Sequence, residues 1–189
     1  SKNRQQALED VLRRTLQDRG VTIIPAFSLG RTQAILYEMN GIFERLQEES
    51  GNSLLKQVDV IVDSPLASRF TELYKSMKDY WGREAQHLMQ TDDQPLVFEN
   101  LTTVNSQREH KDTLAYLDKQ KLPAIVIAGS GMCTGGRVLN YLKRFIANPT
   151  TDLVFVGYQA SGTPGHLISR GCDWVRLNGR KYDVGATVH

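Results

Sequence analysis

The glycine-rich segment Gly129–Gly136 is the part of the sequence whose residue types point most directly to chemistry. It contains four glycines, follows the apolar run Ala124–Ala128 and precedes apolar positions with helical spacing that begin at Val138. A strand that ends in such a loop and continues as a helix presents backbone N–H groups and the positive end of the helix dipole at one point. This arrangement predicts a binding site for phosphate or another anion.

Three other polar loops repeat the pattern, because each follows a short apolar run: Phe27–Arg31, Asp63–Ala67 and Tyr158–Gly165. In a parallel sheet the carboxyl ends of the strands lie at one edge, where ligands of such folds bind. The sequence therefore predicts a shared phosphate-binding edge with these candidate residues: Ser28, Arg31, Ser64, Ser130, Gly131, Thr134, Arg137 and Thr163. The alternative is that the hydroxyl groups only cap helices and that both arginines extend into solvent.

Two better-known phosphate motifs do not fit the glycine-rich segment. In Gly131–Val138, arginine and valine replace the lysine and the hydroxyl residue of the nucleotide-hydrolase phosphate loop, so the magnesium-binding hydroxyl is missing. The dinucleotide fingerprint also fails, because Thr134 occupies the position of its last glycine. Nucleotide hydrolysis and dinucleotide binding are both disfavoured.

The sequence shows no catalytic set of residues. The four histidines lack the local spacing of metal ligands, and no G-x-S-x-G segment presents a nucleophilic serine. Cys133 lies at a predicted helix N-terminus, which would lower its pKa, but no base partner for a thiol nucleophile is evident. We therefore predict no catalytic residue and no metal ligand in this chain.

A framework of alternating strands and helices must position these loops. Apolar runs predict strands over 21–25, 58–62, 124–128 and 153–156. Apolar spacing predicts helices over 8–16 (closed by Gly20), 35–46, 66–77, 111–119 and 138–146, with weaker signals for a helix at 84–90 and an extended piece at 96–98. A hairpin with strands 174–177 and 182–189 ends the chain. The pattern favours a three-layer, Rossmann-like α/β domain with a mainly parallel sheet and helices on both faces; a mixed α+β domain is the alternative.

The bulk composition limits the class of protein. A length of 189 residues suits one sizeable domain, and a net charge of +2 is too small to indicate nucleic-acid binding by itself. The two cysteines suggest no disulfide framework, and no apolar run has the length of a membrane span. We expect a cytoplasmic protein without membrane contact. Both termini interrupt a structural pattern, so we also expect a piece of a longer protein.

Four segments resemble, in sequence, order and spacing, the β-CASP ribonucleases of the metallo-β-lactamase superfamily: Ile24–Gln33, Asp63–Ala67, Ala128–Arg137 and Val156–Gly165. The resemblance implies that residues 1–172 form an α/β domain inserted into a metallo-β-lactamase fold and that residues 173–189 form a hairpin returning to it. It further implies two zinc ions, held by an H-x-H-x-D-H motif, that activate water for RNA phosphodiester hydrolysis. That motif is absent from this chain, so no catalytic or zinc-binding residue is carried over.

The resemblance thus predicts the nucleic-acid-clamping domain of a zinc-dependent ribonuclease in RNA processing or decay, inactive on its own. Its loops would contact RNA phosphate through the eight candidate residues. Expected partners are single-stranded RNA, with DNA as an alternative, and the protein's own metallo-β-lactamase domain; a homodimer is left open. The competing hypothesis is a non-catalytic α/β module that binds a small phosphorylated ligand or docks a partner domain. Without its neighbouring domain, the terminal hairpin should be loosely held.

Overall fold

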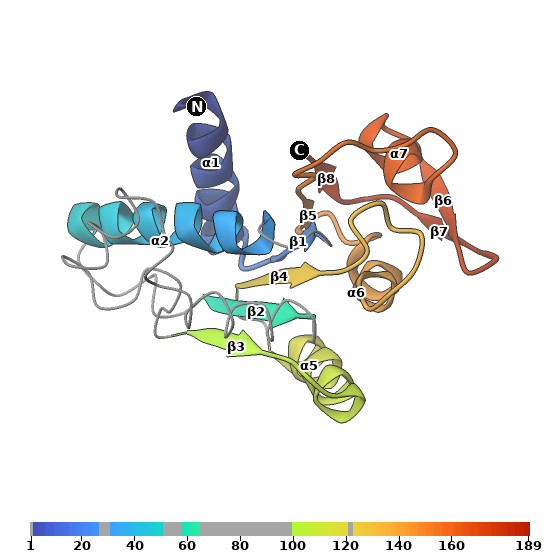
Figure 1. Cartoon of the computed structure of the whole chain (residues 1–189), viewed down its shortest axis with the longest axis horizontal. Coiled ribbons are helices and arrows are strands. Elements are labelled where there is room, and N and C mark those ends of the chain that lie inside the picture. The colour runs from blue at the N-terminus through green and yellow to red at the C-terminus, as the bar shows by residue number, and fades with distance from the viewer. Residues whose placement is uncertain (1, 27–30, 51–57, 65–99, 121–122) are drawn as a thin grey trace, which may run out of the picture.

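Six strands form one sheet in the order β3-β2-β4-β1-β5-β8 in a computed structural model of the chain (Figure 1). Every neighbouring pair in this sheet is parallel. The structure describes residues 2–26, 31–50, 58–64, 100–120 and 123–189. The predicted helices at 66–77 and 84–90 and the extended piece at 96–98 lie outside these ranges. The strands of the sheet are β1 (Val21–Pro25), β2 (Asp59–Asp63), β3 (Leu101–Thr103), β4 (Ala124–Ala128), β5 (Asp152–Leu153) and β8 (Thr187–Val188).

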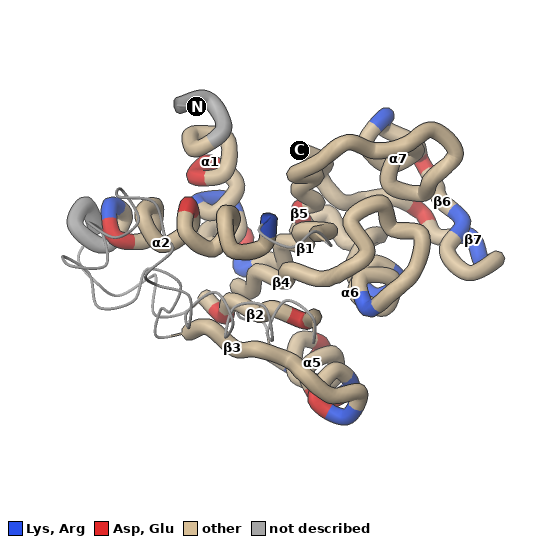
Figure 2. Tube along the Cα trace, viewed as in Figure 1, with Lys and Arg blue, Asp and Glu red and all other residues tan. Residues whose placement is uncertain are grey.

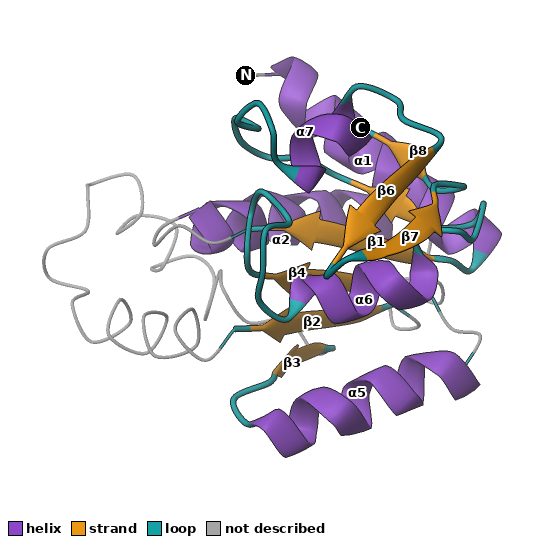
Figure 3. Cartoon of the chain, turned by 90° about the vertical axis from the view of Figure 1, so that its right-hand side faces the viewer, coloured by secondary structure: helices purple, strands orange, loops and turns teal. Residues whose placement is uncertain are grey.

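Helices cover both faces of the sheet (Figure 3). Ile125 and Ile127 of β4 pack with apolar residues of α1 (Lys2–Asp18) and α2 (Arg31–Ser50). Val126, between them, packs on the other face with residues of α5 (Gln107–Lys119) and α6 (Val138–Phe145). Successive strand residues point to opposite faces, and both faces of β4 are buried, which explains its continuous apolar sequence. The predicted mainly parallel α/β fold is confirmed.

The helix α5 begins earlier than its apolar spacing predicted. The Ser106 hydroxyl accepts a hydrogen bond from the Glu109 N–H at 3.1 Å. The Glu109 carboxylate in turn accepts from the N–H groups of Ser106 at 3.3 Å and Asn105 at 2.7 Å. This reciprocal capping box supplies partners for amides at and just before the helix start, so α5 begins at Gln107 and not at Lys111.

The end of α1 involves Gly20, as predicted, but a second residue supplies the left-handed turn. The helix ends at Asp18, and Arg19 takes the left-handed conformation with a φ of 52°. The Gly20 N–H donates to the Thr15 carbonyl at 3.2 Å, which closes the last turn of the helix. Glycine is needed at this position for close backbone contact, because a Cβ atom there would lie 1.8 Å from the carbonyl oxygen of Thr150.

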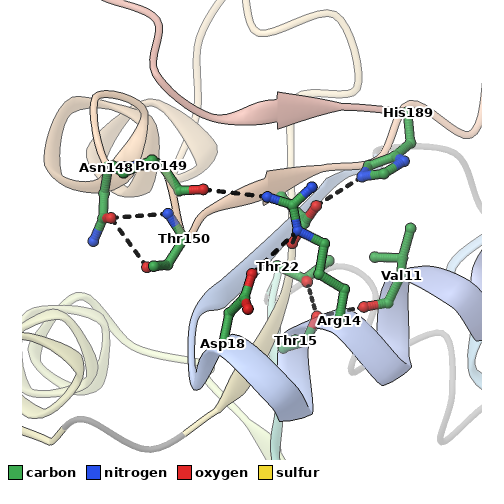
Figure 4. A network of polar contacts seen from close by, with 10 residues as sticks. Val11, Arg14, Thr15, Asp18, Thr22, Asn148, Pro149, Thr150 and His189 are labelled. Carbon is green, nitrogen blue, oxygen red and sulfur yellow. Dashed lines mark hydrogen bonds and ion pairs between the residues drawn. The ribbon is translucent and has the colours of Figure 1, made fainter.

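A buried carboxylate joins α1, β5 and the last residue of the chain (Figure 4). Asp152 is fully buried, and its Oδ1 lies 2.7 Å from His189 Nε2. Its Oδ2 lies 3.6 Å from Arg14 Nε, and Arg14 also donates to the Pro149 carbonyl at 3.3 Å. The strand β5 starts at this aspartate and is shorter than the predicted strand 153–156. These contacts fix α1 against β5 and the residue that follows β8.

The C-terminal segment forms the predicted turn but divides into two structures. The hairpin strands β6 (Trp174–Leu177) and β7 (Arg180–Asp183) are antiparallel, and Asn178 and Gly179 between them have positive φ values. The second predicted strand, 182–189, is wrong as one element, because β7 ends and β8 then joins the main sheet beside β5. The expected loose attachment is not what the structure shows, since Val175 and Leu177 are buried in the main core.

A further short helix, α7 (Pro164–Ser169), packs against β6 and links the hairpin to the carboxyl edge of the sheet. None of the described helices combines the length and the apolar character needed to cross a membrane. The division into residues 1–172 and 173–189 stays a prediction.

Candidate nucleic-acid interface

The loop Gly129–Gly136 is closed by its own hydrogen bonds. The Ser130 hydroxyl accepts from the N–H groups of Thr134 at 3.1 Å and Gly135 at 3.3 Å, and the Val138 N–H donates to the Gly129 carbonyl at 2.8 Å. Gly136 has a φ of +75°, and a Cβ atom there would lie 2.5 Å from the Gly129 carbonyl oxygen. The sequence folds into this tight turn because glycine occupies the position that tolerates neither a side chain nor its backbone angle.

The loop that follows β5 packs directly against this turn. The Gln159 amide donates to the Gly131 carbonyl at 3.0 Å, and the Gly165 N–H donates to the Met132 carbonyl at 3.0 Å. Thr163 caps α7, since its hydroxyl accepts from the His166 N–H at 3.2 Å. The predicted gathering of loops at the carboxyl edge is therefore observed for these two.

Two predicted ligand hydroxyls thus have structural partners. Ser130 closes its loop and Thr163 caps a helix, as the capping alternative anticipated. Thr134 is exposed and its hydroxyl lies 3.2 Å from that of Ser130. Contact of these groups and of Gly131 with phosphate stays a prediction. Ser28 lies outside the described residues.

Arg137 is held by a buried carboxylate. Its Nη1 donates to Asp63 Oδ1 at 2.5 Å and to the Val104 carbonyl at 3.0 Å, and its side chain is 18% exposed. The Asp63 side chain is completely buried at the end of β2. A cation at the start of a helix is unfavourable next to the positive end of the dipole, and Asp63 supplies the compensating charge. Ser64 follows Asp63 directly.

Two further donors converge on the same carboxylate. The Tyr141 hydroxyl of α6 donates to Asp63 Oδ2 at 2.5 Å, and His110 Nδ1 of α5 hydrogen-bonds the same oxygen. The Asn140 amide nitrogen lies 2.8 Å from the other ring nitrogen of His110. Burial, together with the hydrogen bond to Asp63, raises the pKa of Tyr141 well above its ordinary value. This network ties the edge of the sheet to α5 and α6.

Sequence reasoning missed this network. Asp63 stood in a quoted loop, but nothing in the sequence indicated that His110 and Tyr141, far along the chain, would meet it. Buried carboxylates are normally paired, so an aspartate at the end of an apolar run was the available signal.

Arg31 lies at the start of α2 and reaches the loop that follows β5. Its Nη1 donates to the carbonyl of Val156, and Gly157 lies against the same nitrogen. The residue is exposed, and of the five N–H donors of its guanidinium the described residues engage one. Its role in phosphate binding stays a prediction.

Tyr158 adds an exposed aromatic ring to this edge. Its exposed fraction is 80%, and it follows Gly157 in the loop that packs on the glycine-rich turn. Exposed aromatic rings are the usual platforms on which single-stranded bases stack. Tyr158 was not among the predicted site residues, although an aromatic residue in a polar loop after a strand was a usable signal.

The expectation of a lowered pKa for Cys133 was wrong. The thiol is fully buried, and burial raises its pKa to about 12. Because the thiolate is the nucleophilic form, this cysteine is unsuited to catalysis.

A cavity of about 580 Å³ lies between α1, α2 and the segment after Leu153. Its lining is mainly apolar and includes Leu8, Val11, Ile35 and Val154, with Arg31 at one side. Such a lining suits an apolar group better than a small phosphorylated ligand. Among the described residues, no three histidine, cysteine or acidic side chains are placed to hold a metal ion.

The observations define an α/β domain whose carboxyl-edge loops, a buried aspartate–arginine pair and exposed cationic and aromatic side chains lie together. A sequence model of the Beta-Casp domain family matches residues 32–168, and this chain belongs to that family. It is 34% identical over 181 residues to Ribonuclease TTHA0252 of Thermus thermophilus, covering 95% of this chain and 39% of that protein. It is 29% identical to the transcription termination factor FttA of Methanosarcina mazei, covering 95% of this chain and 26% of the factor. The chain therefore spans well under half the length of these relatives.

Proposed function

We propose that this chain is the RNA-clamping domain of a zinc-dependent ribonuclease that acts in RNA processing or decay. Membership of the Beta-Casp domain family and similarity to a protein named a ribonuclease support this proposal. The observation that carries it is the carboxyl edge, where Arg31 is exposed at the start of α2 and Thr134 and Tyr158 are exposed on two adjoining loops.

The clamp holds the backbone of the RNA and does not read its sequence. Arg31 supplies a charge-assisted contact to a phosphate, and the hydroxyl of Thr134 supplies a neutral one. Tyr158 stacks on a base, which every base permits because each has a flat aromatic face. Asp63 acts through Arg137, because it holds that guanidinium at the end of the glycine-rich loop. We therefore expect little preference for base sequence.

Hydrolysis belongs to another part of the full-length protein in this proposal. The described residues offer no metal-binding cluster, so no step of the reaction is assigned to them. The zinc ions would be held by the metallo-β-lactamase domain and would activate the attacking water. The isolated chain should then bind RNA without cleaving it. A cytoplasmic location is part of the same proposal.

The test compares two charge-removing variants at opposite ends of the domain. Arg31→Gln removes a cation at the carboxyl edge, whereas Arg144→Gln removes one in the last turn of α6, where Arg144 pairs with Asp118. Binding of short unstructured A-rich and U-rich RNAs is measured by fluorescence anisotropy across a salt series.

Arg31→Gln should weaken both RNAs equally and reduce the slope of log affinity against log salt by about 0.7, the value for one phosphate contact on a single strand. Arg144→Gln should leave affinity and slope unchanged. Equal behaviour of the two variants would contradict the assignment of Arg31 to the clamp.

A further inference from the structure

The β6–β7 hairpin has one buried and one exposed face. Val175 and Leu177 of β6 point into the main core, and Trp174 and Arg176 alternate with them on the outside. In the antiparallel register Arg176 stands opposite Lys181, and Trp174 opposite Asp183. Residues directly opposite in two strands project from the same face. The outer face of the hairpin therefore carries an indole ring beside two cations.

These side chains form a compact group. The Arg176 guanidinium carbon lies 5.9 Å from the centroid of the Trp174 ring, and Lys181 Nζ lies 5.1 Å from it. The indole is 45% exposed, which is unusual for so large an apolar ring. Cation–π attraction holds the charges beside the ring but leaves much of its surface open to solvent.

Arg176 and Lys181 stand directly opposite each other on this face. Like charges directly opposite each other in a sheet repel. Among the described residues, no carboxylate lies within ion-pair distance of Arg176 or Lys181, although Asp183 stands on the same face. An anionic partner would relieve this repulsion.

The hairpin also lies near the proposed clamp. It projects on the side toward which β2 and β4 point, as Figure 1 shows, and Figure 2 shows its basic residues there. The helix α7 packs against β6 and starts at Thr163, at the end of the loop that contacts the glycine-rich turn. The helix α7 thus connects the carboxyl edge to the hairpin, and a strand of RNA that follows α7 would reach it.

We propose that Trp174, Arg176 and Lys181 form a second contact surface for single-stranded RNA, which extends the clamp along the strand. Two phosphates pair with Arg176 and Lys181, and one base stacks on the exposed part of the indole. An aromatic platform flanked by cations is the arrangement with which proteins bind single strands without reading sequence. This inference rests on the proposed function, because it assumes that RNA passes over the carboxyl edge.

The first experiment measures RNA affinity of the chain and of the double variant Arg176→Gln/Lys181→Gln. Removal of two phosphate contacts should reduce the salt slope by about 1.4. Trp174→Ala should weaken binding about tenfold, whereas Trp174→Phe should retain most of the affinity because it preserves an aromatic face. Circular dichroism and thermal unfolding verify that each variant is folded.

The second experiment needs no hairpin variant. The chain contains two tryptophans, so Trp81→Phe leaves Trp174 as the only one. Stacking of a base should quench Trp174 emission with the same midpoint as the anisotropy titration. Emission that is unchanged while RNA binds would overturn the stacking proposal even if a hairpin variant failed to fold.

Comparison with Arg31→Gln separates the two proposals. If Arg31→Gln weakens binding and the hairpin variants do not, the hairpin surface is wrong and the clamp stands. If only the hairpin variants weaken binding, the hairpin proposal stands and the role of Arg31 is wrong. Absence of RNA binding by the unaltered chain overturns both. Binding of an acidic protein in place of RNA would also overturn the hairpin proposal.

Discussion

Replacement of Asp63 by asparagine should destabilise the fold more than any other single charge change at the carboxyl edge. The carboxylate is completely buried and accepts hydrogen bonds from Arg137, His110 and Tyr141. Asparagine would keep the shape but remove the charge and turn one acceptor into a donor that faces other donors. The Arg137 guanidinium would then be left without its ionic partner.

The expected magnitude follows from these contacts. A hydrogen bond to a charged group contributes about 1.5–3 kcal/mol, and loss of one member of a buried ion pair costs about 3–5 kcal/mol. Because the three contacts share one carboxylate they are not additive, so we expect a loss of about 3–5 kcal/mol. With a urea m-value of about 2 kcal/mol per molar, the unfolding midpoint would fall by about 2 M.

Asp59→Asn is the matched control. Asp59 starts the same strand and accepts one hydrogen bond, from the Tyr116 hydroxyl at 2.7 Å, at the surface. That hydrogen bond raises the pKa of Tyr116, but solvent reaches the pair, so the control should lose less than about 1 kcal/mol. Urea unfolding followed by circular dichroism measures both variants. A loss for Asp63→Asn no larger than that for Asp59→Asn would refute the reasoning.

Three other predictions use local features. Gly136→Ala should destabilise by about 1–3 kcal/mol because of its left-handed backbone and the nearby Gly129 oxygen, whereas Gly135→Ala, with open space around it, should be nearly neutral in the same urea assay. With its pKa of about 12, Cys133 should be about one ten-thousandth thiolate at pH 8, so mass spectrometry should find it alkylated only after unfolding; rapid native labelling would contradict its burial. Glu109→Gln should destabilise near neutral pH. The backbone N–H of Asn105 holds the folded pKa of Glu109 below 4.5, so its contribution is present above that value and lost as the pH falls through the lowered pKa; a pH-independent difference would argue against this.

The fold was readable from the sequence because the strands are buried on both faces. In β4, Ile125 and Ile127 contact one helical layer and Val126 the other, so the strand reads as an unbroken apolar run. This composition is specific to central parallel strands and needs no knowledge of distant contacts. The helix spacing and the Asn178–Gly179 turn were equally local signals.

Features that depend on distant contacts were not readable. The 182–189 segment has strand character throughout, but nothing in its sequence indicates that β8 leaves the hairpin to pair with β5. The Asp63 carboxylate hydrogen-bonds His110 and Tyr141, which lie 47 and 78 positions further along the chain. Polar residues at such separations show no shared sequence pattern. The start of α5 is a different case, because Ser106 and Glu109 have capping-box spacing that could have been recognised.

The candidate site was predicted in position more successfully than in detail. The loops after β4 and β5 do meet at the carboxyl edge. Their hydroxyl groups, however, first serve the backbone, because Ser130 and Thr163 supply partners for amides that would otherwise lack them. The groups that can contact RNA are instead side chains that project from the loops, and Tyr158 is the most exposed of them.

Photo-crosslinking of RNA to the chain tests the central claim most directly. The chain is irradiated with single-stranded RNA that contains 4-thiouridine, and the crosslinked peptides are identified by mass spectrometry. Crosslinks within 129–137 and 156–165, with Tyr158 prominent, are the predicted result. Crosslinks confined to the amino edge of the sheet, such as the Arg19–Gly20 turn, or no crosslink at all, would contradict the proposal that the carboxyl edge holds RNA.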